Sequence, residues 1–331
     1  VTSWSHGQSD YNNMRASGQP LDSYLFHNMA SGITKHGVQS YYSQNQKMSY
    51  ALRFNYVYKD KYIASFTTRW DGASHLADGH KWESFPAGAL AWRISQEPFM
   101  QSTEKWLSNL KLRLSYGVTG NQSIDPYSTF SMYGSNSNLY YADGSGNAQT
   151  AFTVTNLSNN SLKWEKTASW NAGLDFGLFN SRLSGTLDVY QKKTTDLLIS
   201  RTLPGSAGFA STYYNQGAMK NNGVELSLNA QIIDKKDWKW SVSGNIGFNK
   251  SEIAELGLLP SDFGFLGEKV GYYGNSIGDH FGVGHVFLEG EAPGLFFGYV
   301  TQGIVQPEDI TEQGCLLYTS PSPRDSTSCR M

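Results

Sequence analysis

Long stretches in which apolar and polar residues strictly alternate constrain the fold of this chain more than any other feature. In the first stretch, Tyr50, Leu52 and Phe54 share one phase of the pattern, while Arg53 and Asn55 lie on the other. Side chains alternate between the two faces of a β-strand, so a period of two indicates a strand with one apolar face. The pattern resumes after a short polar link, which predicts a long antiparallel hairpin.

The same pattern recurs along the chain and predicts eight strands. Each runs for about 10 to 12 residues, roughly twice the usual length in globular proteins. At about 3.3 Å per residue and a tilt near 45°, such strands rise about 25 Å, the height of the apolar band of an outer-membrane barrel. The predicted strands are 48–58, 62–70, 84–95 (the weakest pattern), 110–118, 168–178, 183–189, 224–232 and 238–248.

The links between these strands alternate in length. The shorter links are 59–61, 96–108, 180–181 and 234–237, and the longer links are 71–83, 120–166, 192–222 and the segment from 249 to about 293. All long loops therefore emerge at one end, as in barrels with short periplasmic turns and long external loops. We expect an all-β antiparallel meander that forms part of a transmembrane β-barrel, with its apolar face against outer-membrane lipid. A soluble β-sandwich also alternates, but it explains neither the strand length nor the loop pattern.

Composition agrees with this fold and excludes other classes. Aromatic residues make up 14% of the chain and charged residues 16%, below the roughly 25% that is usual for soluble domains. The formal net charge of −2 gives no basic surface for nucleic acid. No run of about 20 apolar residues predicts a transmembrane helix. We expect Leu114, Leu174 and Leu226 to face lipid, and the aromatic girdles to include Tyr58, Trp70, Trp82, Trp170 and Trp238.

No motif in the sequence predicts catalysis, a metal site or a cofactor. "GNSIG" at 274–278 has the spacing of a hydrolase nucleophile elbow, but its Asp and His neighbours are adjacent in sequence and cannot easily form a relay. "ADGSGNAQT" at 142–150 lacks the Gly and the closing Glu of a calcium loop. The histidine pairs have no further ligands at zinc spacing. We therefore expect that the protein is not an enzyme.

Several stretches resemble the SusC/RagA-type, TonB-linked outer-membrane transporters of Bacteroidetes. They include "NYVYKDKYIASFTTRWDGAS", "WLSNLKLRLSYGVTGNQSIDPYST" and "LKWEKTASWNAGLDFGLFNSRLSGTLDVYQKKTTDLL", and with "GLFFGYVTQGIVQ" the resemblance spans roughly 49–306. It implies a barrel of about 22 strands filled by an N-terminal plug, a TonB-contacting segment before the plug, and a SusD-like surface lipoprotein as an external lid. No plug is recognisable in this sequence, which resembles an internal to C-terminal barrel fragment. We expect residues 1–314 to be barrel and the unpatterned residues 315–331 to be a non-native tail.

Two groups of residues are candidates for functional contacts. The first lies on the polar phase of the strands, where it can contact solute or plug, or pair internally: Arg53, Arg69, Arg113, Asp175, Asp188 and Glu225. The second lies in or near the external loops, where aromatic rings can stack on sugars: Trp82, Tyr140, Tyr141, Tyr213 and Tyr214.

The expected function is TonB-driven import of oligosaccharides or, less often, peptides across the outer membrane. Two alternatives stay open at this point. One is a soluble glycan-binding β-sandwich, and the other is a small closed eight-stranded barrel with a structural or adhesion role.

Overall fold

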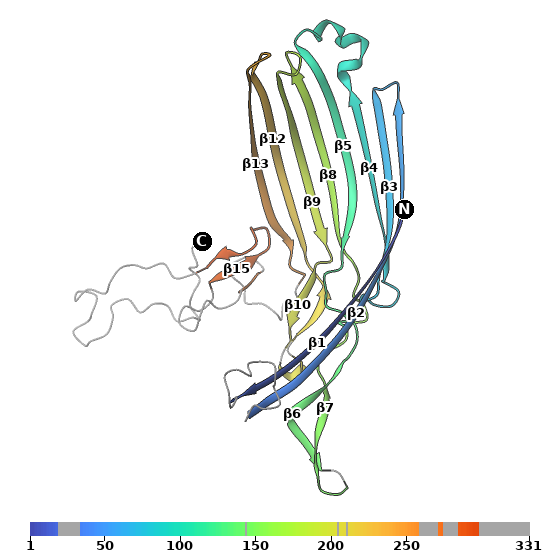
Figure 1. Cartoon of the computed structure of the whole chain (residues 1–331), viewed down its shortest axis with the longest axis vertical. Coiled ribbons are helices and arrows are strands. Elements are labelled where there is room, and N and C mark those ends of the chain that lie inside the picture. Colours follow the sequence, from blue (N-terminus) through green and yellow to red (C-terminus); the bar gives the residue numbers. More distant parts are fainter. Residues whose placement is uncertain are drawn as a thin grey trace, which may run out of the picture.

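The chain forms one large antiparallel sheet. The computed structural model describes residues 1–18, 34–142, 144–203, 205–209, 211–257, 271–273 and 284–297. Nine strands lie in the order β1-β2-β3-β4-β5-β8-β9-β12-β13, which is a meander interrupted only by insertions (Figure 1). They are β1 (Thr2–Ser17), β2 (Thr34–Tyr58), β3 (Tyr62–Ala73), β4 (Trp82–Arg93), β5 (Leu107–Asn121), β8 (Glu165–Leu178), β9 (Leu183–Thr195), β12 (Ala218–Asp234) and β13 (Lys239–Glu255).

Short strands stand outside this sheet in the long links. The hairpin of β6 (Tyr133–Ala142) and β7 (Ala148–Val154) lies between β5 and β8, and the hairpin of β10 (Leu198–Thr202) and β11 (Ser211–Asn215) lies between β9 and β12. A small sheet of β14 (Gly271–Tyr273), β15 (His285–Leu288) and β16 (Leu295–Phe296) follows β13. Figure 1 shows these pieces at the end of the sheet opposite the short turns. No described helix has the length and hydropathy that a membrane span requires.

The sheet confirms the predicted antiparallel meander, with two corrections. β1 was not predicted, and β2 begins at Thr34 rather than near residue 48. Both extensions lie beyond the apolar stretch, where no alternation marks a strand. Within the described ranges β1 and β13 are the sheet edges, so the sheet is open and is not a small closed eight-stranded barrel. Residues 274–278 and the predicted tail 315–331 lie outside the described part.

Tight turns and one buried carboxylate organise the end with the short links. Lys59 and Asp60 adopt positive φ angles of 49° and 54° in the β2–β3 turn. Glu97 lies between the 3₁₀ helices η3 (Ile94–Gln96) and η4 (Pro98–Thr103) of the β4–β5 link. Its carboxylate accepts hydrogen bonds from Tyr62 Oη (2.8 Å), Trp92 Nε1 (3.1 Å) and Lys61 Nζ (3.1 Å). These bonds lower the pKa of the Glu97 carboxyl and tie the two links together.

The strand register sorts side chains into rows that cross the sheet. Directly paired residues of an antiparallel sheet point to the same face. On one face, here called the apolar face, Leu174 pairs with Leu187, Leu187 with Leu226, and Leu226 with Ile246. On the other, called the polar face, Arg113 pairs with Gly173 and Asp188 with both Gly173 and Glu225.

The apolar face has no protein layer over it. Phe54 of β2 is 61% exposed and Phe248 of β13 is 69% exposed, although each is paired within the sheet. Soluble monomers rarely expose a continuous apolar surface that extends across several strands. The structure therefore identifies this face as the side that meets lipid in a larger barrel.

The orientation of the two faces can be tested with a matched pair of arginine substitutions in β12. Leu226→Arg places a charge in the centre of the apolar face and should cost about 2 to 4 kcal/mol of unfolding free energy. Ser227→Arg points to the polar face and should be nearly neutral. Urea titration of the complete barrel in lipid vesicles measures both. A severe effect at Ser227 with a neutral one at Leu226 would reverse the assignment of the faces.

Candidate functional site

A network of charged side chains crosses three strands on the polar face. The Arg113 guanidinium of β5 donates from Nε to Asp175 Oδ1 of β8 (2.8 Å) and from Nη2 to Asp188 Oδ2 of β9 (3.1 Å). Lys111, two residues earlier in β5, places Nζ 3.0 Å from Asp175 Oδ2. Two cations and two carboxylates therefore balance one another, which favours a structural role for most of this charge.

A glycine makes this network possible. Arg113 must reach across β8 to contact Asp188, and Gly173 lies directly between them in the paired row. A Cβ atom at Gly173 would lie 2.5 Å from Asp188 Oδ1 and 2.6 Å from Arg113 Nη2. A side chain at position 173 would therefore have to displace the end of Arg113 or of Asp188.

The row continues from this network to a carboxylate on the next strand. Glu225 of β12 pairs directly with Asp188 and with Gly247 of β13. Its carboxylate interacts with the Tyr190 hydroxyl. Beside this row the surface forms a shallow hollow of about 580 Å³. Its lining includes the polar residues Asn109, Asp175, Ser184, Thr186, Ser227, Asn229, Ser243 and Asn245.

The other two predicted arginines stand apart from this network. Arg53 Nε of β2 donates to Thr67 Oγ1 on β3 (3.1 Å). Arg69 Nε of β3 contacts the Asp71 carboxylate at 2.7 Å, near the end with the long loops. The structure thus brings together Arg113, Asp175, Asp188 and Glu225, but not Arg53 or Arg69. Lys111 and Gly173 were not singled out from the sequence, although Lys111 shares the phase of Arg113.

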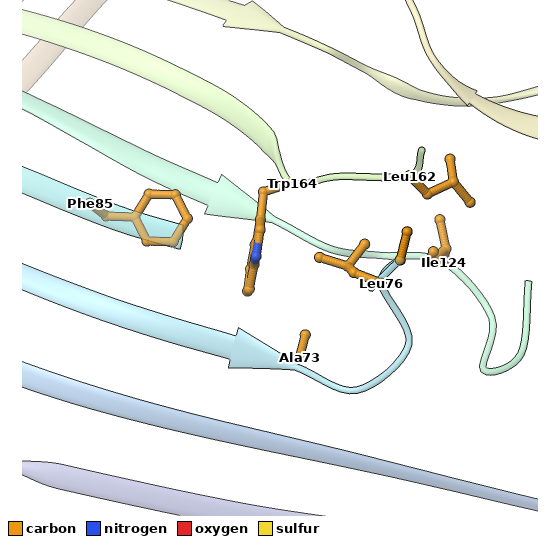
Figure 2. Packing of buried hydrophobic residues seen from close by; sticks show 7 residues of the cluster. Ala73, Leu76, Phe85, Ile124, Leu162 and Trp164 are labelled. Carbon is orange, nitrogen blue, oxygen red and sulfur yellow. The ribbon is translucent and has the colours of Figure 1, made fainter. Parts of the chain in front are cut away.

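The long loops pack together around a small hydrophobic core, here called the loop cluster. Its buried members are Ala73, Leu76, Ala77, Phe85, Ile124, Leu162 and Trp164. Figure 2 shows them converging from the ends of several strands and their loops. The β4–β5 ladder stops at the pair Ala87 and Gly117, and the cluster lies beyond this point. Phe85 and Trp164 meet edge to face with ring centroids 5.4 Å apart.

Hydrogen bonds between loops fix the loop cluster from several directions. Ala77 N donates to Leu162 O (3.1 Å), and Trp164 Nε1 donates to Lys81 O (3.1 Å). Asn215, the last residue of β11, donates through Nδ2 to Lys163 O and accepts through Oδ1 from Lys163 N, both at 2.8 Å. The loops after β3, β5 and β9 therefore form one connected unit.

His75 is a titratable group buried in this unit. The residue is 6% exposed, and its Nε2 atom lies 2.8 Å from Gln122 O. Its Nδ1 atom has no hydrogen-bond partner among the described residues. Burial lowers the pKa of His75 below its ordinary value of 6.5; the hydrogen bond to Gln122 opposes this shift, and the charge of Lys47 adds to it. The neutral imidazole is therefore the form that fits the site.

The five aromatic candidates occupy different places. Trp82 is the first residue of β4 and stacks on Tyr50 of the apolar face, with ring centroids 5.9 Å apart. Tyr213 packs against the loop cluster, and the Tyr214 ring lies 5.9 Å from the Arg201 guanidinium. Tyr140 pairs with Thr150 in the β6–β7 hairpin, and Tyr141 of the same hairpin is exposed.

Two exposed rings of that hairpin were missed from the sequence. Tyr133 is 73% exposed and Phe152 is 70% exposed. Tyr133 pairs with Val154, and Phe152 lies two residues before Val154 on β7, so the two rings lie on one side of the hairpin. No long alternation marks this segment, and only the pairing shows that the two rings share a face.

The role of Gly173 can be tested with a control glycine in the same row. Gly173→Ala should cost about 1 kcal/mol of unfolding free energy, because the new methyl group displaces the flexible end of Arg113 or Asp188 and weakens their ion pair. Gly247→Ala meets only ordinary contacts, the nearest being Glu225 Cγ at 3.5 Å, and should stay within about 0.5 kcal/mol. Denaturant titration compares the two variants. Equal costs would show that the network does not depend on the gap at Gly173.

The loop cluster should loosen in mild acid because of His75. The unfolded segment binds a proton at a higher pH than the folded one, so stability is full above about 6.5 and falls as pH decreases towards the lowered folded-state pKa. Hydrogen exchange of the Ala77 amide between pH 8 and pH 5 measures this opening, after correction for intrinsic rates. His75→Gln should remove the dependence, whereas His80→Gln, at an exposed position in the same loop, should keep it. An unchanged profile in His75→Gln would assign the effect to another group.

Comparisons with known proteins agree on one family. The model described as "TonB dependent receptor-like, beta-barrel" matches residues 2–301. TonB-dependent receptor P3 of Formosa agariphila is 33% identical over 298 residues, which cover 90% of this chain and 28% of that protein. TonB-dependent receptor SusC of Bacteroides thetaiotaomicron is 41% identical over 219 residues, which cover 66% of this chain and 22% of SusC. The chain thus spans about a quarter of the length of these relatives.

Solved structures give the same result. The structure of the RagAB peptide transporter matches with a TM-score of 0.72 and 29% identity, over 89% of this chain and 30% of that chain. The RagAB peptide importer in its "closed-closed" state matches with a TM-score of 0.77 and 27% identity, over 98% of this chain and 34% of that chain. The chain belongs to the TonB-dependent receptor family and forms part of the β-barrel of a SusC/RagA-type protein of the outer membrane.

Proposed function

We propose that this chain is part of the barrel wall of a TonB-dependent importer that carries oligosaccharides or peptides across the outer membrane. The observation that carries the proposal is the division of one nine-stranded sheet into an apolar face and a polar face. Such a sheet can separate lipid from a wet interior. The family to which the chain belongs supplies the import function.

The names of the relatives and the exposed rings of the loops both bear on the class of solute. One relative is named SusC, and the matched RagAB structures are described as a peptide transporter and importer. In this chain, the exposed Tyr133, Tyr141 and Phe152 can stack on sugar rings, at about 0.5 to 1.5 kcal/mol per ring pair by analogy with aromatic pairs. Between the two classes we favour an oligosaccharide, because the strands β6 and β7 carry exposed rings and no charge; the charged residue of this hairpin, Asp143, lies between them in the sequence.

The proposed partners follow from the same family. A SusD-like lipoprotein would cover the end with the long loops, and TonB would supply the energy for import. For Arg113, Asp175 and Asp188 we propose a structural role in the barrel wall, because their charges neutralise one another. Glu225 remains the carboxylate that is best placed to contact plug or solute.

We assign no chemical step to the protein. Among the described residues no group of three or more His, Cys, Asp or Glu side chains is placed to hold a metal ion. The relatives are named as receptors, and none carries an enzyme name. In the proposed role the solute passes through the barrel unchanged.

The experiment is growth on single oligosaccharides or peptides as carbon source after deletion of the intact gene. Complementation with the native gene should restore growth on one class. A version whose β6–β7 hairpin is replaced by a short Gly-Ser link should restore it weakly, because the solute loses its aromatic platform. A version with Tyr133→Ala and Phe152→Ala tests the rings alone, and Trp82→Ala serves as the control on the apolar face.

Antibody labelling of intact cells checks that each version reaches the surface. Unimpaired growth of the deletion strain on every oligosaccharide and peptide, together with a leaky outer membrane, would favour a structural barrel instead. If the deletion strain lost growth only on peptides, the solute would be a peptide and not an oligosaccharide.

A further inference from the structure

The apolar face ends in a group of lysines on the side of the long loops. Near this end of β9, β12 and β13, successive rows of the face change from apolar to polar and then to charged. Val189, Val224 and Phe248 form one row; Gln191, Asn222 and Lys250 form the next; Lys193, Lys220 and Glu252 form the third. All nine side chains lie on the same face as the lipid-facing leucines.

The middle row lies at the level of an interfacial tryptophan. Trp170 of β8 pairs with Gln191, and its indole Nε1 donates to Gln191 Oε1 (3.0 Å). Tryptophan at a barrel edge marks the boundary between hydrocarbon and headgroups. Two residues along a strand cover about 6 to 7 Å, so Lys193 and Lys220 lie within reach of lipid headgroups.

The lysines are arranged so that they repel one another. Lys193 and Lys220 are directly paired across two strands, where like charges are destabilising. Glu252 is shared between Lys220 at 3.9 Å and Lys250 at 3.6 Å. Three ammonium groups thus have one neighbouring carboxylate in these rows, and the pairs with it are long. A bound anion would offset the excess charge.

One buried polar atom lies at the centre of this group of lysines. The side-chain oxygen of Asn222 is buried and has no hydrogen-bond partner among the described residues. It lies in the row between Gln191 and Lys250, beneath the surface that a lipid would contact.

We infer that Lys193, Lys220 and Lys250 form a binding site for the phosphate groups of lipids in the external leaflet of the outer membrane. The site is continuous with the lipid-facing surface, its charge is complementary to phosphate, and its height matches the headgroup layer. A soluble anion would have to enter the headgroup layer to reach it, whereas a phosphorylated lipid is already held beside the apolar rows. The site goes beyond import and depends only on the barrel lying in the outer membrane.

The test compares lysines on opposite faces of the same strand. Lys193→Gln with Lys220→Gln removes the pair, while Lys192→Gln is the control, because Lys192 points to the other face and lies 5.1 Å from the Tyr190 ring centroid. The intact protein in detergent is titrated with lipid A bearing both phosphates and with the same lipid after removal of its phosphates. Native mass spectrometry counts the bound lipids.

The intact protein should prefer the phosphorylated lipid, and the double variant should bind it about 20- to 30-fold more weakly, at about fivefold per lysine. The control should stay within about twofold. Binding should weaken as salt is raised. Equal affinity for the two lipids, or an equal loss in the Lys192 control, would overturn the inference. Full displacement by millimolar inorganic phosphate would assign the site to a free anion and would also overturn it.

The unfolding stability of the double variant, relative to that of the intact protein, gives a second test, because the difference should change sign between the two lipids. In phosphate-free lipid the double variant should be at least as stable as the intact protein, because the repulsion between Lys193 and Lys220 is gone. In phosphorylated lipid it should unfold at a lower urea concentration than the intact protein. A variant that is less stable in both lipids would show that the lysines act in folding, which contradicts the inference.

Discussion

Everything in this structure depends on the need to satisfy backbone hydrogen bonds without help from water. Lipid offers no partner for an N–H or C=O group, so a strand that crosses it must be paired along its length. The ladder from β2 to β13 meets this need with pairs that extend over most of each strand. Because a slip of one residue would turn every side chain to the wrong face, the same pairing fixes which residues meet lipid and which meet the interior.

Charged side chains of the sheet are either paired where they are buried or placed where they can reach water or headgroups, because an unpaired buried charge is costly. On the polar face, Arg113 is held between two carboxylates across strands that the ladder brings together, and the lack of a side chain at Gly173 leaves room for the contact. At the short-turn end, Glu97 is buried but accepts three hydrogen bonds. Lysines that lack such partners stand at the rim of the apolar face, where their heads reach beyond the hydrocarbon.

The sequence predicted the part of the fold that lipid imposes and missed the part that it does not. Eight strands were visible because an apolar phase must continue across the membrane. β1 was not predicted, because the residues on its lipid-side phase include His6, Gln8 and Asp10 and show no apolar alternation. The sequence also predicted that Arg113, Asp175 and Asp188 lie on the polar phase of their strands. Their contact could not be predicted, because it depends on the pairing of β5 with β8 across a long insertion. The loop cluster has no periodic signal at all, since its residues come from separate loops.

The loops differ in how firmly they are attached to the wall, and this decides which of them can respond to a solute. The segments around Leu76, Leu162 and Asn215 share one core and are bonded to one another, so moving one requires opening the others. The β6–β7 hairpin is joined to its base by bonds such as Thr155 N to Met132 O (2.8 Å) and Asn156 Nδ2 to Phe130 O (2.7 Å). Its rings Tyr133 and Phe152 are exposed, and neither belongs to the core of the loop cluster. A hairpin of this kind can change its angle at a small energetic cost, whereas the ladder beneath it cannot move without breaking many hydrogen bonds at once.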